Sequence, residues 1–348
     1  MSRLRRVDCS GPGIVRRGRG CGFEYFDEHG DRIDDGEVIA RIRALVIPPA
    51  WKDVWICPDP MGHIQAVGTD AAGRRQYVYH PRWRERRDQQ KFDDMVRFAR
   101  ALPHVRETTA KHLAQKTVTR ERVLACAVRL LDRGFFRIGT EGYAEQNQTY
   151  GLATMQKRHV TLGEGEVITF DYAAKGGKRR VQSIVDPTVY ELVATLKRRR
   201  GGPELLAYRN GRAWVDARSD DINEYIKEIA GEDFSAKDFR TWSATVIAAV
   251  ALAVSGRAAA TKTARKRAIA RAIKEVAHYL GNTPAVCRAS YIDPRVFDRF
   301  RDGITIGGAL ESLGEGIALG EPAFQGAVEE AVLDLLEDER TPAIEQVA

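Results

Sequence analysis

The stretch Leu280–Tyr291 reads LGNTPAVCRASY, and we interpret the other motifs of the chain in relation to the tyrosine that ends it. A basic segment with helical spacing, residues 263–280, runs into this stretch, and Pro284 suits the first turn of a further helix. A tyrosine hydroxyl can attack a phosphodiester when neighbouring cations bear the charge that develops on the phosphate. Tyr291 is therefore a candidate nucleophile if the rest of the chain supplies such cations.

Three cations upstream of Tyr291 have the side chains that this chemistry needs. Arg137 lies in FFRIGTEGY and Arg240 in KDFRTWSAT, and a guanidinium donates two hydrogen bonds at once to phosphate oxygens. Lys175 lies in DYAAKGGKRR, where the Gly-Gly pair predicts a tight hairpin turn, and an ammonium there can protonate a leaving alkoxide. Lys178 is the alternative for this role. Each residue alone is more often a surface charge or a packing residue, so the signal lies in the ordered set.

The 348 residues suffice for two domains, and their charge is unevenly distributed. Residues 1–310 hold 54 basic and 38 acidic residues, a net charge of +16, whereas residues 311–348 hold ten acidic residues and one basic residue, Arg340. The basic body predicts a nucleic-acid partner. We expect the acidic tail, residues 311–348, to compete with phosphates, so that its removal would tighten binding to that partner.

Several classes of site and location are not supported by the sequence. The five cysteines include no C-x-x-C pair and the seven histidines lack metal-ligand spacing, so we expect no metal, no disulfide framework and no cofactor. No G-x-x-x-x-G-K-[ST] nucleotide loop occurs. The longest mainly apolar run, residues 244–254, is too short to span a bilayer, and the basic N-terminus lacks an apolar signal region. We expect a cytoplasmic, nucleoid-associated protein without membrane contact.

The first 85 residues predict a small, mostly β domain behind a basic arm. Residues 1–20 are rich in Arg and Gly and lack periodicity, so we expect a mobile arm there. Residues 21–85 contain short strand-like runs such as DVWICPD and RRQYVYH, with one helix that Asp34 or Asp35 could cap. The polar, proline-bearing segment HPRWRERRDQQ, residues 80–90, is the expected domain boundary.

Residues 86–348 predict a larger, mainly α-helical domain, so the expected fold class is α+β. Thr119–Arg133 is the clearest amphipathic helix, with Gly134 placed to end it and Arg137 in the turn that follows. Strand-like runs on both sides of KGGKR predict a hairpin. Further helices are expected over residues 189–200, 221–229, 237 to about 255, 263–280 and, in the acidic tail, 324–337.

This ordered set resembles the small type IB DNA topoisomerases of bacteria and poxviruses, over nearly the whole chain from Phe23 to about Phe300. Each motif alone is weak, but their order and spacing together are specific. In chain order, the motifs that carry the resemblance are IPPAW (47–51), QYVY (76–79), FRIGTEGYAEQNQTYGLATMQKRHV (136–160), the lysine hairpin AAKGG (173–177), the K-D-x-R motif KDFR (237–240) and the nucleophile motif LGNTPAVCRASY (280–291).

The resemblance implies a bilobed clamp around duplex DNA, a monomer, and the catalytic fold that these enzymes share with tyrosine recombinases. It implies that Tyr291 forms a 3′-phosphotyrosyl bond, that the freed strand rotates and that the break is resealed, without ATP or metal. The catalytic residues that it implies are Arg137, Lys175, Arg240, Asn282 and Tyr291. The DNA-contacting residues that it implies are Gln76, Tyr77, Tyr79, Tyr143, Lys157 and Arg158. For the aromatic residues of QYVY, strand packing is the alternative role.

Asn282 departs from the poxviral pattern, which has a histidine nine residues before the tyrosine. An asparagine amide can donate a hydrogen bond to a phosphate oxygen but carries no charge, and its alternative role is to cap the helix that begins near Pro284. A tyrosine recombinase is the alternative function. Recombinases usually carry a histidine three residues before the second arginine, where this chain has Lys237. A DNA-binding protein without enzymatic activity would explain the basic charge alone.

Overall fold

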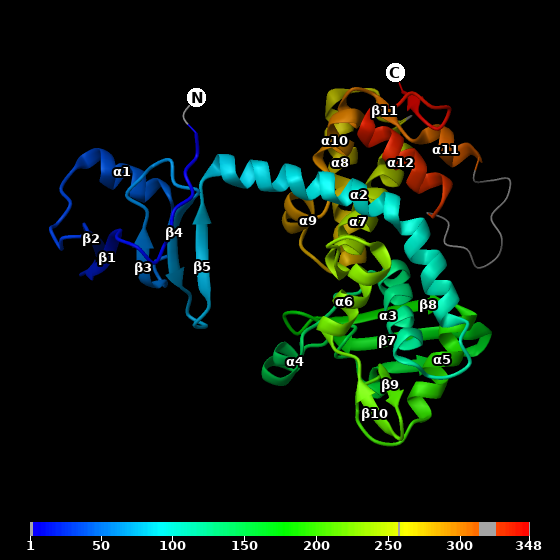
Figure 1. The fold of residues 1–348 in the computed structure, drawn as a ribbon. Coiled ribbons are helices and arrows are strands. Elements are labelled where there is room, and N and C mark those ends of the chain that lie inside the picture. The colour runs from blue at the N-terminus through cyan, green and yellow to red at the C-terminus, as the bar shows by residue number, and fades with distance from the viewer. Residues whose placement is uncertain (1–2, 257, 313–324, 348) are drawn as a thin grey trace. The chain divides into compact units, whose positions relative to one another are not determined.

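The computed structural model describes residues 3–256, 258–312 and 325–347, and the chain divides into two compact units, residues 1–91 and 92–348 (Figure 1). Each unit has its own hydrophobic core. The division falls inside helix α2 (Pro81–Leu113). The boundary expected over residues 80–90 thus lies next to the observed division, but this segment is helical and not a linker. The proline there occupies the first helical position, which it suits, and the charged side chains lie on a helix surface instead of in a loop.

The N-terminal unit is an antiparallel sheet with one short helix. Its strand order is β2-β1-β3-β4-β5, and the apolar side chains under the sheet pack against the helix. Asp35 caps that helix as predicted, because its carboxylate accepts hydrogen bonds from the backbone N–H groups of Glu37 and Val38. The elements of this unit are β1 (Ile14–Arg19), β2 (Gly22–Phe26), α1 (Gly36–Ala44), β3 (Lys52–Ile56), β4 (Ile64–Thr69) and β5 (Arg75–Tyr79).

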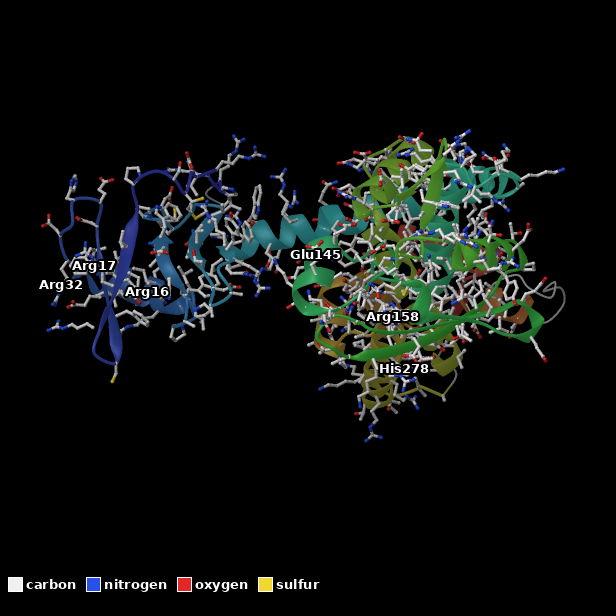
Figure 2. The ribbon with its side chains drawn as sticks, turned by 90° about the horizontal axis from the view of Figure 1, so that it is seen from below. Arg16, Arg17, Arg32, Glu145, Arg158 and His278 are labelled. Carbon is white, nitrogen blue, oxygen red and sulfur yellow. The ribbon has the colours of Figure 1, made fainter. Side chains whose placement is uncertain are left out.

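The prediction of a mobile arm over residues 1–20 is wrong for its second half, because strand β1 pairs there with β2 and β3. Arg16 explains how a basic segment becomes part of a sheet. Its guanidinium donates to the carbonyls of Pro48 at 3.2 Å and Trp51 at 2.6 Å, in the IPPAW loop. Figure 2 labels Arg16 among the side chains of this unit. The arginine thus provides hydrogen-bond donors for carbonyls of this loop.

The larger unit, residues 92–348, is mainly helical with small antiparallel sheets. The sheet β6-β7-β8 and the hairpin β9-β10 lie together on one side of this unit, and α8, α10, α11 and α12 gather on the other (Figure 1). The elements after α2 are α3 (Arg120–Gly134), α4 (Glu141–Asn147), η1 (Lys157–His159), β6 (Val160–Leu162), η2 (Glu164–Glu166), β7 (Val167–Ala173), β8 (Arg179–Val185), α5 (Pro187–Arg198), β9 (Ala207–Asn210), β10 (Ala213–Asp216), α6 (Ser219–Ala230), α7 (Ala236–Gly256), α8 (Lys262–Leu280), α9 (Pro284–Ser290), α10 (Pro294–Arg301), β11 (Ile304–Thr305), α11 (Gly307–Ser312), α12 (Ala327–Glu337) and β12 (Glu345–Gln346).

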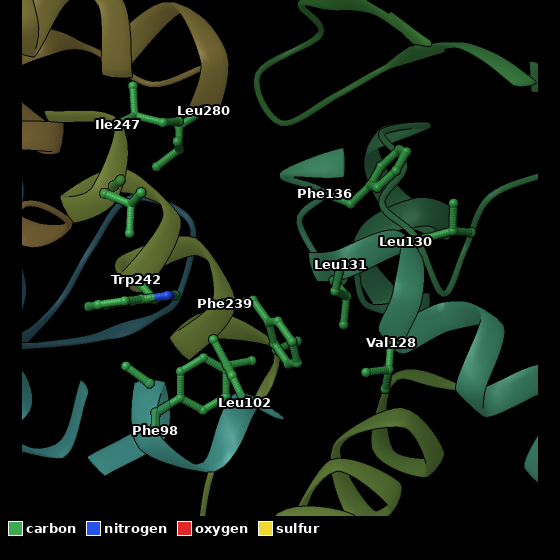
Figure 3. Close-up of a cluster of buried hydrophobic side chains, with 14 of the residues drawn as sticks. Phe98, Leu102, Val128, Leu130, Leu131, Phe136, Phe239, Trp242, Ile247 and Leu280 are labelled. Atoms are coloured by element: carbon green, nitrogen blue, oxygen red, sulfur yellow. The ribbon is translucent and has the colours of Figure 1, made fainter. Parts of the chain in front are cut away.

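Helix α7 is the centre of this core. By length and composition it is apolar enough to cross a membrane, but most of it is buried inside the unit, as in the core helix of a globular domain. It packs against α3, α8, α10 and α12. Figure 3 shows Phe239, Trp242 and Ile247 of α7 among Phe98 and Leu102 of α2 and apolar residues of α3. The K-D-x-R motif therefore starts on a buried helix, which fixes the position of Arg240.

Helix α3 begins and ends where the sequence predicts. The Thr119 hydroxyl accepts from the Arg122 backbone N–H at the start. At the end, Gly134 is still helical and Phe135 takes the left-handed conformation, with φ 53°. The chain turns sharply at this point, and Arg137 follows within the turn region.

The described part of the acidic tail packs into the core of this unit, so it is not the separable segment that the expected effect of its removal assumes. Helix α12 buries Val328, Val332, Leu335 and Leu336. Its Glu329 accepts from the Trp242 indole at 2.7 Å and from Arg106, which also pairs with Asp132 at 2.9 Å. Burial disfavours the charge of Arg106, but its hydrogen bonds to both carboxylates raise its pKa overall. Residues 313–324 lie outside the described residues.

Deleting residues 311–348 is therefore expected to unfold the catalytic unit. Each fully buried aliphatic side chain of α12 contributes about 1.5–3 kcal/mol, and the total is comparable to the roughly 5–15 kcal/mol that stabilises a whole domain. Thermal unfolding of the truncated chain, followed by circular dichroism, checks this.

The matched control is Glu330→Gln with Glu339→Gln, which neutralises two exposed tail carboxylates and leaves the apolar packing of α12 in place. This control should melt as the unchanged chain does. A truncated chain with an unchanged melting curve would contradict the assignment of α12 to the core.

Candidate active site

A cavity of about 540 Å³ in the unit of residues 92–348 collects side chains from four separate parts of the sequence. The turn after α3 supplies Arg137, the β7–β8 hairpin supplies Lys175, helix α7 supplies Arg240, and the turn between α8 and α9 supplies Asn282. Four of the five residues predicted for catalysis thus line one cavity. Tyr291 is not among its lining residues.

The C-terminal end of α8 organises this cavity. Three consecutive carbonyls at that end each accept a hydrogen bond from a different arginine. The pairs are Arg180 with the Tyr279 carbonyl, Arg240 with the Leu280 carbonyl at 3.0 Å, and Arg137 with the Gly281 carbonyl at 3.1 Å. The last carbonyls of a helix lack intrahelical partners and form the negative end of its dipole, so cations stabilise them. One helix end therefore brings three guanidinium groups together.

Arg240 is the most deeply buried of these cations, with 4% of its surface exposed. Besides the Leu280 carbonyl, it donates to the carbonyl of Phe135, the left-handed residue at the end of α3. Its Nε has no hydrogen-bond partner among the described residues. Burial lowers the pKa of Arg240 to about 10, and the nearby Tyr291 phenol acts in the opposite direction. The guanidinium therefore stays charged at neutral pH, and its Nε–H remains available as a hydrogen-bond donor.

Tyr291 directly follows α9, and Arg240 links it to the cavity. The Arg240 Cζ lies 5.4 Å from the centre of the Tyr291 ring, a cation–π distance. The Tyr291 backbone N–H donates to the Cys287 carbonyl at 3.0 Å, and its half-buried ring packs against the core. The predicted nucleophile is thus held beside the predicted second arginine, 51 positions apart in the sequence.

Asn282 does not cap helix α9, so that alternative role is wrong. Thr283 is the cap, because its hydroxyl accepts from the Val286 backbone N–H. The Asn282 Oδ1 instead accepts from Arg137. Its buried Nδ2 has no partner beyond the Cys287 thiol, a weak acceptor, among the described residues. Asn282 therefore both orients the first arginine and keeps a donor without a strong acceptor.

Lys175 and Lys178 both lie at the predicted hairpin turn. The Ala174 N–H donates to the Lys178 carbonyl at 2.8 Å, and Gly176 and Gly177 adopt positive φ angles, which closes the turn. Both ammonium groups are exposed and both line the cavity, so the choice between them stays open. Lys175 also lines an adjoining cavity of about 240 Å³ together with Arg137 and Tyr143.

The three residues of the QYVY motif that were predicted to contact DNA lie on two faces of strand β5. Tyr77 and Tyr79 share the exposed face, with their rings stacked 5.9 Å apart, and the Arg75 guanidinium lies 5.8 Å from the Tyr77 ring. Gln76 points to the other face and donates to the Asp70 carboxylate at 2.9 Å. Gln76 is thus held by Asp70 within this unit, whereas the two tyrosines form an exposed aromatic surface.

The remaining three predicted DNA contacts also differ from one another. Tyr143, on α4, is 45% exposed and lines the smaller cavity beside Arg137. Arg158 is exposed and donates to the Tyr150 hydroxyl at 3.2 Å (Figure 2). The Lys157 ammonium is occupied by the carbonyls of Arg199 and Gly201, at 3.0 and 2.8 Å, which gives it a structural role.

Sequence reasoning missed Arg180, which lines the main cavity with the predicted residues. The signal was the two-residue alternation of β8, which places Arg180 on the inward face with Gln182 and Ile184. The outward valines Val181 and Val185 obscured that alternation, since they are exposed. In the described part of the chain, no three His, Cys, Asp or Glu side chains are grouped so as to hold a metal ion.

Comparisons with known proteins show which family this chain is similar to. The family described as eukaryotic DNA topoisomerase I, catalytic core, matches residues 80–305, and the family described as bacterial DNA topoisomerase IB, N-terminal domain, matches residues 22–70. DNA topoisomerase 1B of Acanthamoeba polyphaga mimivirus is 32% identical over 287 residues, which cover 80% of this chain and 85% of the relative. DNA topoisomerase 1B of vaccinia virus (strain Copenhagen) is 21% identical, over 77% of this chain and 84% of the relative.

These matches cover both compact units, and the mimivirus relative is similar along most of both chains. The reported relatives are named DNA topoisomerases, and none supports the recombinase alternative. This chain belongs to the type IB DNA topoisomerase family.

Proposed function

We propose that this enzyme relaxes supercoiled duplex DNA by cutting and resealing one strand through a covalent 3′-phosphotyrosyl bond on Tyr291. The observation that carries the proposal is the position of Arg240. Its buried guanidinium lies beside the Tyr291 ring and is fastened to two helix ends, while Arg137 and Lys175 line the same cavity. A phosphate bound beside Arg240 would meet fixed positive charges close to the proposed nucleophile.

The arginines would stabilise the charge that develops on the phosphate oxygens. Donors fixed before the reaction stabilise such charge better than water, because they do not need to reorient. Arg137 and Arg240 are both held by backbone carbonyls. Arg240 Nε and Asn282 Nδ2 are buried donors without a strong acceptor among the described residues, which suits a site for an anion.

The chemistry that we propose exchanges one phosphodiester for another. The Tyr291 oxygen forms a bond to phosphorus and loses its proton to solvent, while the bond from phosphorus to the 5′ oxygen breaks. That oxygen leaves with a proton from Lys175. The reverse reaction reseals the strand after the free end has rotated. The energy of the broken bond is conserved in the new one, so the cycle needs no ATP. The arginines and Lys175 supply the positive charge that a metal ion would otherwise provide, so we propose that no metal ion is needed. One chain carries every residue involved.

The exposed Tyr77 and Tyr79, with Arg75 beside them, are the residues of the N-terminal unit that we propose to contact DNA. Aromatic rings and a guanidinium suit contacts with sugars, bases and phosphates in a groove. Tyr143 is the matching proposal for the other unit, because it adjoins the cavity that Arg137 and Lys175 line.

Relaxation of plasmid DNA should proceed in excess EDTA without nucleotide, and Tyr291→Phe should abolish it. The substitution removes only the hydroxyl, so DNA binding should persist while the covalent adduct is lost. The measurement is detergent trapping of protein-linked DNA beside the relaxation assay. An absolute need for magnesium or ATP, or normal relaxation by Tyr291→Phe, would rule out the proposed mechanism.

Lys175→Ala should fail at expulsion of the 5′ oxygen. Loss of a general acid costs roughly 10²–10⁴-fold in rate, and a substrate with a 5′-bridging sulfur should recover most of this loss, because a thiolate leaves without an acid. Single-turnover cleavage of both substrates measures this. Lys178→Ala is the matched control from the same turn and should cleave both at nearly the normal rate. Sulfur rescue of Lys178→Ala instead would assign the acid to Lys178.

Asn282→Ala should slow single-turnover cleavage by roughly 10²-fold, the typical cost of one preorganised donor. Asn282→Asp should be slower still, because the carboxylate keeps the acceptor for Arg137 but removes the Nδ2 donor and repels a phosphate. Asn282→His should keep substantial activity, since even a neutral imidazole donates one hydrogen bond. If Asn282→Asp cleaves at the normal rate, Asn282 acts only by orienting Arg137.

A further inference from the structure

Arg180 joins parts of the proposed active site that are distant in the sequence. From strand β8, its Nε donates to Gln182 at 2.6 Å, and its Nη2 donates to the Tyr279 carbonyl at the end of α8. Gln182 in turn donates to the Gly134 carbonyl at the end of α3. One pair of side chains therefore ties the lysine hairpin to the ends of two helices.

Gly281 shows how closely this guanidinium approaches the turn between α8 and α9. A Cβ atom at this position would lie 2.6 Å from the Arg180 Nη1, and the backbone has a φ of +62°. Glycine is therefore favoured here, because another residue would strain the backbone and displace the Arg180 guanidinium. The next residue, Asn282, holds Arg137, so Arg180 packs against the turn that orients the first arginine.

The surroundings of Arg180 give it a fixed position without a carboxylate. Burial lowers its pKa, and the neighbouring Tyr172, which faces it across the hairpin, acts in the opposite direction. Burial raises the pKa of Tyr172, so this phenol is neutral at physiological pH. Arg180 forms no ion pair with the described residues. Carbonyl and amide oxygens hold the guanidinium instead, as they hold Arg240.

We propose that Arg180 is a positioning residue that holds the β7–β8 hairpin against the α8–α9 turn, so that Lys175 reaches the leaving 5′ oxygen while Arg137 and Asn282 hold the phosphate. The proposal rests on the function proposed above for Tyr291 and Lys175. Two Arg180 donors are directed at Gln182 and the Tyr279 carbonyl, so its task is to set the distance between hairpin and turn.

The test is single-turnover cleavage by Arg180→Met of a duplex with a mapped cleavage site, carrying either the natural 5′ oxygen or a 5′-bridging sulfur. A misplaced group costs on the order of 10²-fold in rate, so we expect a loss of about that size with oxygen. Because the thiolate leaves without an acid, the sulfur substrate should restore cleavage to within about tenfold of the unchanged enzyme. Lys175→Ala combined with Arg180→Met should be no more than about tenfold slower on the oxygen substrate than Lys175→Ala alone.

Arg179→Met is the matched control. Arg179 is the preceding residue and also lines the main cavity, but its exposed guanidinium pairs with Asp171 at 2.6 Å and not with the end of α8. It should cleave both substrates at the normal rate. Arg180→Lys keeps a cation and one donor, which guards against loss of folding, and it should show a smaller loss with the same sulfur rescue.

Two results would overturn the proposal. The first is that Arg180→Met or Arg180→Lys stays slow on the sulfur substrate. The second is that the rate losses of Lys175→Ala and Arg180→Met multiply in the double variant. Either result would show that Arg180 acts on the phosphate itself. Absence of a covalent adduct with the unchanged enzyme on either substrate is a different result, because it removes the proposed function before any variant is compared.

Discussion

The end of helix α8 is the constraint on which the candidate site depends. A helix leaves its last carbonyls without partners, and burying them unpaired costs free energy. Here the carbonyls of residues 279, 280 and 281 each bind a separate arginine, from β8, α7 and the turn after α3. The need to satisfy one helix end thus assembles three cations that the sequence keeps far apart. Their mutual repulsion is offset by the negative end of the α8 dipole.

This arrangement also explains how Arg240 can be buried with its charge. An isolated buried charge costs several kcal/mol even after local relaxation, and Arg240 meets this cost with the carbonyls of Phe135 and Leu280. Phe135 is available because it leaves α3 in the left-handed conformation, which turns its carbonyl away from the helix. The same turn leads to Arg137. The end of α3 therefore positions both arginines, one through its backbone and one through the sequence that follows.

Local patterns predicted most of the fold. The cap at Asp35, the extent of α3 and α8, and the Gly-Gly hairpin depend on neighbouring residues, and the structure confirms them. What failed depends on contacts across the sequence. The polar segment 80–90 indicated a domain boundary but not the helix that runs through it. The acidic composition of the tail did not reveal that its helix packs into the core, where Glu329 meets Arg106 and Trp242. The sequence predicted that Asn282 either donates to a phosphate oxygen or caps the helix that begins near Pro284. Its contact with Arg137 is neither of these.

The proposed site residues have structural partners, and this affects how substitutions should be interpreted. Arg137 holds the α8–α9 turn and Arg240 holds two helix ends, so replacing either removes a charge and releases backbone carbonyls together. The loss of cleavage rate in such a variant then has two causes, weaker transition-state stabilisation and poorer positioning. An alanine substitution alone cannot separate them. Preorganised catalysis requires this overlap, because a cation that is already fixed by the fold does not reorganise when the phosphate gains charge. The contacts that hold the helix ends together would thus be the same contacts that prepare the site for its substrate.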